Sequence, residues 1–196
     1  MGNNLLYFAG VQASGTDGMA LAWFGNPTAV APTSALLPEV PLNADGWHDA
    51  GMVTEDGLTA KFSQETKKIK AYGSNQVQRT LVTGEETSFS LAFQETNPVS
   101  TAIWTRKAVG YYVPDANGAW ELVHGPYEQR FYSAMFEMID GPNHIRMYVP
   151  KIEVTDRVDR KAAAGEVFTW GVTMTAYPDA SGNTAYEYIV MNALAA

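Results

Sequence analysis

Apolar and polar residues alternate with a period of two over several stretches of this chain. In residues 88–94, Phe89, Leu91 and Phe93 alternate with small or polar residues, and residues 168–176 show the same pattern over a longer run. Such alternation places one set of side chains on a single face of a β-strand. The chain is therefore predicted to be mainly β, folded as a β-sandwich of two sheets or as a flattened barrel.

Turn-forming residues separate further predicted strands. These strands span 5–11, 19–24, 111–113, 120–123, 127–139, 145–154 and 185–191. Residues 127–139 would also fit one face of a helix, so the pattern leaves the type of that element open. Pro150 interrupts the alternation in 145–154, and it predicts a bulge or an edge strand there because proline cannot donate to a ladder.

One short α-helix is expected after residue 96. Asn97 can cap the free backbone N–H groups, and Pro98 suits the first helical turn, where its missing donor has no consequence. The spacing of the following apolar residues continues to Arg106 and Lys107, which would lie in the last turn. Trp104 fits either a core or an interface position, and the core is favoured.

Residues 25–46 predict an extended N-terminal arm or loop. They contain four of the ten prolines of the chain. Proline lacks the backbone N–H and biases the preceding residue toward extended geometry, so neither a helix nor a central strand is expected. A long irregular segment inside a compact domain is usually a functional loop or a linker. Contact with another subunit is the favoured interpretation over disorder.

Length and composition indicate a soluble globular protein. The 196 residues are enough for one domain with a substantial core, and no cysteine is present for disulfides or thiol chemistry. The start of the chain lacks the basic region of a signal peptide, and no stretch reaches membrane-spanning length. The net charge of −8 argues against tight binding of DNA or RNA, which requires clustered bases.

The charge is unevenly distributed along the chain. Residues 1–60 contain six acids and no lysine or arginine, whereas residues 61–196 have a net charge of −2. Two interpretations remain open. The acids could simply lie on solvated loops, or an acidic arm could dock on a basic patch, either of the same chain or of a neighbouring copy. The candidate bases for that patch are Lys61, Lys67, Lys68, Lys70 and Arg79.

No pattern of catalytic or metal-binding residues is found, so the protein is expected to be no enzyme and to use no cofactor. His48, His124 and His144 each lie alone beside a predicted turn. The nucleotide-binding, zinc-protease and serine-hydrolase motifs are missing from the sequence. Five tryptophans could instead form a sugar-stacking surface, which makes a carbohydrate-binding β-sandwich module the alternative function. A hydrolase with two unrecognised carboxylates is a third possibility.

A turn at Glu55-Asp56-Gly57, flanked by Val53 and Leu58, predicts a tight strand reversal. Around it the segments follow one another in a recognisable order. A block at 47–59 is followed by 69–73, 77–82 and 87–98, and it is preceded by a proline-containing run at 30–38. This order resembles the major tail (tail tube) proteins of long, non-contractile tailed bacteriophages, most closely over residues 25–100.

The resemblance implies a single tail-tube domain over residues 1–196, six copies of which form a ring. Stacked rings would form the tail tube of the virion, which is assembled in the host cytoplasm. DNA would pass through the lumen of this tube without being bound tightly, and no membrane is an expected partner. The expected partners are further copies of the chain and the tail tape-measure and tail terminator proteins. We expect subunit contacts at ten residues: Pro32, Pro38, Trp47, Val53, Glu55, Asp56, Leu58, Lys67, Lys68 and Lys70.

Overall fold

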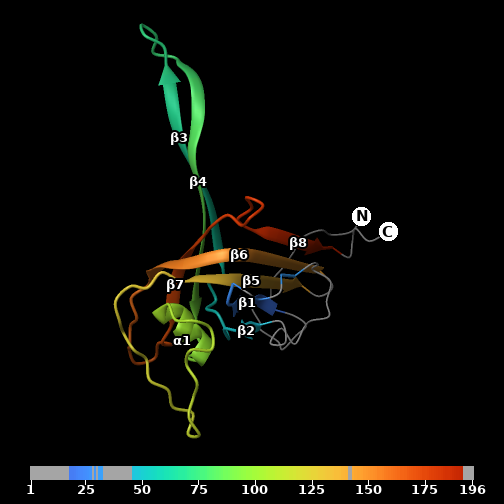
Figure 1. The fold of residues 1–196 in the computed structure, drawn as a ribbon, viewed down its shortest axis with the longest axis vertical. Helices are drawn as coiled ribbons and strands as arrows, with labels where there is room; N and C mark the ends of the chain where they lie inside the picture. The colour runs from blue at the N-terminus through green and yellow to red at the C-terminus, as the bar shows by residue number, and fades with distance from the viewer. Residues whose placement is uncertain (1–17, 28, 30, 33–45, 141–142, 192–196) are drawn as a thin grey trace.

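A computed structural model describes residues 18–27, 29, 31–32, 46–140 and 143–191 of the chain (Figure 1). The predicted strand at 5–11 and most of the proline-rich arm lie outside these residues. The elements, in chain order, are β1 (Gly18–Gly25), β2 (Trp47–Asp49), β3 (Thr59–Lys70), β4 (Val77–Phe93), α1 (Pro98–Thr105), β5 (Phe131–Asp140), β6 (Asn143–Arg157), β7 (Trp170–Ala176) and β8 (Tyr186–Val190).

The eight strands form one continuous antiparallel sheet. Their order is β2-β1-β5-β6-β7-β4-β3, and β8 pairs with the first half of β6. The prediction of a mainly β fold with one short helix is confirmed. The helix α1 packs beside β6 and β7, on one side of the sheet (Figure 1).

The sheet curls until its two sides are joined by one stretch of chain. Residues 50–54 hydrogen bond to both sides: Ala50 donates to the carbonyl of Ala22 in β1 (3.0 Å), and Thr54 donates to the carbonyl of Ala92 in β4 (2.8 Å). Gln94 in turn donates to the carbonyl of Met52 (2.8 Å). A single curled sheet of this kind matches the flattened barrel rather than two separate sheets.

The barrel interior is filled by apolar side chains from β1, β4, β5, β6, β7 and α1. Phe24 lies at its centre, edge-on to Phe93, Tyr132 and Phe136, with ring centroids 5.9 to 6.5 Å apart. Edge-to-face packing of this kind stabilises aromatic pairs beyond the area that they bury. The odd residues Phe89, Leu91 and Phe93 of β4 all point into this core, as their alternation predicts.

The helix begins as the sequence predicts and ends differently. The Asn97 side chain accepts hydrogen bonds from the backbone N–H groups of Val99 (2.9 Å) and Ser100 (2.8 Å), which confirms it as the N-cap. Arg106 was expected in the last helical turn. It is instead the C-cap, with φ = 60°, so its side chain leaves the helix and reaches β6. Trp104 is buried in the core, as favoured.

The predicted strand reversal at Glu55-Asp56-Gly57 is wrong. The turn itself forms, with the Gly57 N–H donating to the carbonyl of Thr54 (2.9 Å) and a positive φ of 64° at Gly57. However, the chain on both sides of it runs antiparallel to the same strand, β4, because Val53 pairs with Phe93 and Thr59 pairs with Ser90. Residues 54–58 therefore project from a segment that continues along β4 on both sides of the turn.

Three further predictions are settled by the strand pairing. Residues 131–140 form a strand, not a helix, and Pro150 coincides with a register shift between β5 and β6, which confirms the bulge. β6 as a whole is not an edge strand, because β5 lies on one side of it and β8 and β7 lie on the other. Pro150 itself lies in the gap between β8, which pairs up to Tyr148, and β7, which pairs from Ile152. The turn at 114–118 is present, but the residues that flank it form no strands.

Candidate subunit interface

The β3–β4 hairpin extends far beyond the rest of the sheet. Only residues Thr87–Phe93 of β4 pair with β7, so residues 77–86 have β3 as their single neighbour. Together with residues 63–70 of β3 they form a two-stranded ribbon, which projects from the body in Figure 1. We call residues 63–86 the ribbon. At about 3.3 Å per residue, its eight β3 residues give a length of about 26 Å.

The ribbon has no core of its own. Its apolar side chains are in water, including Ile69, Val77 and Val82 with exposed fractions of 41%, 44% and 55%. Tyr72, in the turn at its end, is fully exposed, and Phe62 at its base is 64% exposed. An isolated two-stranded hairpin is marginally stable in water. Two unpaired edges and exposed apolar residues make the ribbon a candidate for contact with another chain.

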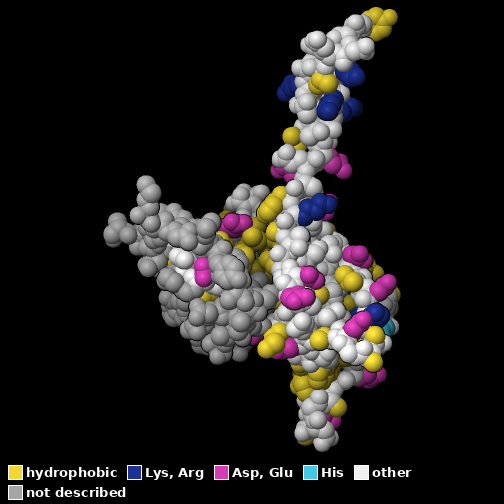
Figure 2. Space-filling view, turned by 180° about the vertical axis from the view of Figure 1, so that it is seen from behind, with side chains coloured by type: hydrophobic (Ala, Val, Ile, Leu, Met, Phe, Trp, Pro, Cys, Tyr) yellow, Lys and Arg dark blue, Asp and Glu magenta, His cyan; other side chains and the backbone are white. Residues whose placement is uncertain are grey.

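The outer part of the ribbon is strongly basic. Residues 66–82 contain Lys67, Lys68, Lys70 and Arg79 and no acid, a net charge of +4. The rest of the chain then holds nine bases and twenty-one acids, a net charge of −12. Figure 2 shows Lys and Arg side chains along the projecting column and Asp and Glu side chains over the visible face of the body. The end of the ribbon and the body of a second copy thus have opposite charge.

Both faces of the ribbon combine bases with aliphatic residues. Lys67 pairs with Leu81 and Ile69 pairs with Arg79 across the two strands, which places these four on one face. Lys68 lies on the other face, opposite Thr80. Register shifts after Glu65 and after Ile69 mark bulges, which bend a ribbon and increase its twist. Each face can therefore contact a different neighbour.

The acidic candidates lie on the body. Glu55 and Asp56 occupy the projecting turn before β3, and both are exposed. Among the described residues, neither side chain makes a hydrogen bond or an ion pair. No other two acids that are consecutive in the described sequence both lack such a partner. In the other adjacent pair, Glu85 and Glu86, the Glu85 side chain accepts a hydrogen bond from Gln64 (2.8 Å).

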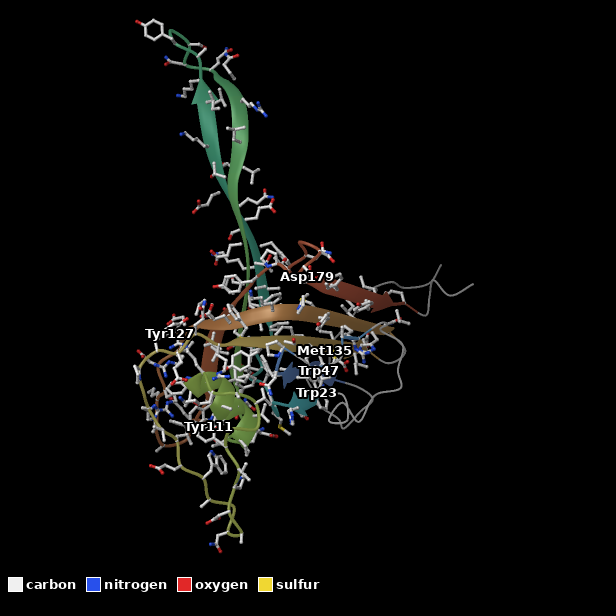
Figure 3. The ribbon with its side chains drawn as sticks, in the orientation of Figure 1. Trp23, Trp47, Tyr111, Tyr127, Met135 and Asp179 are labelled. Atoms are coloured by element: carbon white, nitrogen blue, oxygen red, sulfur yellow. The ribbon has the colours of Figure 1, made fainter. Side chains whose placement is uncertain are left out.

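The remaining candidates have positions within the subunit or outside the described residues. Trp47 is buried against Met135 and Tyr148 in a second small core, and Val53 is buried in the main core. Figure 3 shows Trp47 close to Met135. The side chains of Trp47 and Val53 therefore stabilise the subunit itself, and an interface role for them stays a prediction. Three other candidates complete the set: Leu58 is half-buried against the main core, the Pro32 carbonyl accepts a hydrogen bond from the Tyr188 hydroxyl (2.9 Å), and Pro38 lies outside the described residues.

Sequence reasoning missed the exposed apolar residues of the ribbon. The sequence around Ile69, Val77 and Val82 does not reveal that these residues lie beyond the sheet, because an alternating strand has the same local pattern whether or not a third strand covers it. Whether a third strand pairs with residues 77–86 depends on the whole sheet, and no local sequence pattern shows it.

No group of three or more metal-ligating side chains is found in the part of the chain that the structure describes. Nor, within those same residues, does any helix have the length and apolar character needed to span a bilayer. Among the surface features of the described residues are a projecting basic ribbon and an acidic body.

Comparison with known proteins gives the family. A family model described as "Phage tail tube protein" matches residues 14–196. A search of curated proteins gives no match. Among solved structures the chain is similar, at 9% identity and a TM-score of 0.44, to a chain of "Cryo-EM structure of the anti-feeding prophage (AFP) baseplate, 6-fold symmetrised"; the match covers 90% of this chain and 97% of that chain. Because the family model spans nearly the whole sequence, this chain belongs to the phage tail tube protein family and is a structural subunit of the tail tube in the virion.

Proposed function

We propose that the ribbon is the element through which one copy of the chain holds the next in the tube. The observation that carries this proposal is a two-stranded ribbon with a net charge of +4 over residues 66–82, with apolar side chains in water, on a chain that is otherwise strongly acidic. Contacts between different surfaces of identical subunits close a ring in one direction and repeat along an axis in the other. A projecting basic ribbon and an acidic body are two such surfaces.

The same proposal includes the finer features that the sequence resemblance implies. The rings contain six copies, the tail is of the long, non-contractile type, and the tape-measure and terminator proteins are further partners. The support is the order of segments over residues 25–100. Sixfold class averages in electron microscopy of isolated tubes test the ring, and any other symmetry would contradict it.

The experiment for the ribbon shortens it without disturbing the body. Residues 68–80 are replaced by Asn-Gly, a two-residue turn favoured in hairpins, between Lys67 and Leu81, which pair across the strands. We expect the unfolding midpoint and far-UV circular dichroism to stay close to those of the parent protein. Sedimentation should show a monomer, and negative-stain electron microscopy should show rings or tubes for the parent alone.

A matched variant separates charge from length. Replacing Lys67, Lys68 and Lys70 by Gln keeps the whole ribbon and removes three of its four bases. If opposite charge drives the contact, this variant should need a higher protein concentration to assemble, and added salt should have less effect on it than on the parent. Tubes formed by the shortened protein would contradict the proposal for the ribbon.

A further inference from the structure

A pocket of about 400 Å³ lies beside the last turn of α1, on the body of the protein. Trp104 of α1, Arg157 at the end of β6, and Val158, Asp159, Arg160 and Phe168 of the following loop line it. Sequence analysis gave no indication of this pocket, because its residues are separated by some fifty positions along the chain.

Two arginines of the pocket lie over aromatic rings. The guanidinium carbon of Arg160 lies 4.1 Å from the ring centre of Trp104 and 4.6 Å from that of Trp170. That of Arg157 lies 4.6 Å from the Trp104 ring. A guanidinium over an aromatic ring is attracted by the ring without using its N–H groups as hydrogen-bond donors, so the guanidinium N–H groups stay available. Among the described residues, those of Arg157 and Arg160 form no hydrogen bond and no ion pair.

A third arginine adds positive charge to the same place. Arg106 donates from Nε to the carbonyl of Val154 (3.0 Å) and stacks over the ring of Tyr127 at 4.7 Å. Partial burial lowers the pKa of Arg157, and the charges of Arg106 and Arg160 lower it further, while Asp156 opposes them. Neither Asp156 nor Asp159, the nearest acids along the chain, forms an ion pair with any of the three arginines. The cluster therefore favours the approach of an anion.

The surroundings of the pocket have the composition of a protein interface. Four apolar side chains beside it are in water: Val123, Tyr127, Val158 and Val167 have exposed fractions of 47% to 61%. Figure 3 places Tyr127 beside α1, on the body and away from the ribbon. Tryptophan, tyrosine and arginine are the residues most enriched at the energetically important centres of protein interfaces.

We propose that this arginine pocket binds the exposed Glu55–Asp56 turn of a second copy of the chain. The turn presents two adjacent carboxylates without a partner among the described residues, and the pocket presents two guanidinium groups that likewise have no hydrogen-bond or ion-pair partner there. Arginine–carboxylate pairs are often bidentate, and they are stronger and more directional than neutral hydrogen bonds. Since the turn and the pocket are different surfaces, each bound copy leaves one of each free for the next.

This contact rests on the self-assembly proposed above, and charge reversal tests it. Arg157→Glu with Arg160→Glu gives a copy with an acidic pocket, and Glu55→Lys with Asp56→Lys gives a copy with a basic turn. Each double variant alone should need at least tenfold more protein than the parent to form rings or tubes, measured by sedimentation and negative-stain electron microscopy. Mixed in equal amounts, the two variants should assemble again, because each pocket then meets a turn of opposite charge.

Two controls keep the result interpretable. Lys161→Glu changes the charge in the same direction one residue from Arg160, by half as much as the double variant does, at an exposed site paired with Glu166, and should leave assembly unchanged. Arg157→Gln with Arg160→Gln removes the charge without reversing it, and tryptophan fluorescence and the unfolding midpoint show whether the variants are folded. The Gln variant should assemble more weakly than the parent. It tests the contact even if the charge-reversed variant fails to fold.

Three results would overturn the contact. One is assembly of the folded arginine variants at the concentration that the parent needs, and another is failure of the mixed charge-reversed variants to assemble although both are folded. The third is a salt-sensitive shift of duplex DNA by the parent that the arginine variants lose, which would make the pocket a phosphate site. If the parent protein stays monomeric, the proposed self-assembly itself is wrong. If the ribbon variants lose assembly as expected but the arginine variants assemble like the parent, only the contact between the pocket and the turn is wrong.

Discussion

Phe24 of β1 packs edge-on against Phe93 of β4, with ring centroids 5.9 Å apart and ring planes at 76°. The two strands are not neighbours in the sheet, since β5, β6 and β7 lie between them. The contact therefore crosses the interior of the curled sheet. Both rings are fully buried, so this pair holds the two sides of the barrel together.

Replacement of Phe93 by alanine should destabilise the subunit by about 3–5 kcal/mol, because it leaves a cavity at this crossing. Urea unfolding measures the loss. Phe62→Ala is the matched control, since Phe62 lies at the base of the ribbon with 64% of its surface exposed and should change the free energy of unfolding by less than about 0.5 kcal/mol. Equal losses for the two variants would contradict the barrel closure.

Asn97 should contribute more than an ordinary helix cap. Besides accepting from Val99 and Ser100, its Nδ2 donates to the carbonyl of Ala50 (3.1 Å), which joins α1 to the segment that closes the barrel. Asn97→Ala should lower the free energy of unfolding by about 1–2 kcal/mol. Asn97→Asp keeps the acceptor and loses the donor, so it should fall between the two. Coincident unfolding curves for the alanine variant and the parent would contradict the cap.

The stability of the subunit should fall at alkaline pH through Tyr132. Burial raises the pKa of its hydroxyl, which donates to the carbonyl of Lys107 (2.9 Å), above the ordinary value of 10.0. A raised folded-state pKa contributes stability that is complete below the unfolded-state pKa and is lost as the pH rises above it. From about pH 10 upward, the parent should lose stability faster than Tyr132→Phe, by up to about 1.4 kcal/mol per pH unit.

Tyr132→Phe should itself be less stable than the parent at neutral pH, by about 1 kcal/mol for the lost hydrogen bond. Free energies of unfolding at several pH values between 8 and 11 give both quantities. The comparison isolates Tyr132 from the other tyrosines, which titrate in both proteins. A constant difference across this range would show that the hydroxyl of Tyr132 does not titrate differently in the folded and unfolded protein.

Gly171 in β7 is a site where even one methyl group should disturb the fold. A Cβ at this position would lie 2.7 Å from Cβ of Val158, whose own N–H donates to the Gly171 carbonyl (3.0 Å). Gly171→Ala should cost about 1–3 kcal/mol through this overlap. Gly84→Ala is the control, because Gly84 is also in a strand and its nearest neighbouring side-chain atom lies at 3.5 Å. Thermal unfolding of both variants tests the difference.

Purified protein should show no measurable affinity for duplex DNA at physiological salt. A tube that lets a polyanion slide must not hold its phosphates, and this chain has thirteen bases against twenty-one acids. The bases of the ribbon are proposed to contact a neighbouring copy. A mobility-shift assay measures the affinity. A clear shift that disappears with added salt would instead place the basic ribbon on the wall of the channel.

Local patterns predicted the elements of this fold better than their partners. The alternation of Phe89, Leu91 and Phe93 depends on burial of one strand face, and the cap at Asn97 depends on two neighbouring N–H groups, so both are visible in a short stretch of sequence. The turn before β3 was predicted correctly as a turn and wrongly as a reversal. Turn chemistry determines the backbone of a few residues, whereas the strand that each side joins depends on the whole sheet.

The candidate site illustrates the same limit. The lysines of the ribbon were identified as interface candidates from their charge alone. The ribbon itself could not be predicted, because it is the part of the β3–β4 hairpin that no third strand pairs with. The arginine pocket was not foreseen at all. It brings Trp104 next to Arg157 and Arg160, and only the packing of α1 against the end of β6 makes them neighbours.

The two-stranded construction of the ribbon has a mechanical consequence. A ribbon with no third strand and no core bends out of its plane far more easily than the closed barrel from which it projects, and the bulges after Glu65 and Ile69 supply points at which it can flex. In a tube whose neighbouring copies are held through such ribbons, curvature would be taken up between subunits while each barrel keeps its shape. A tube built in this way would bend in solution and return to straight without any of its subunits unfolding.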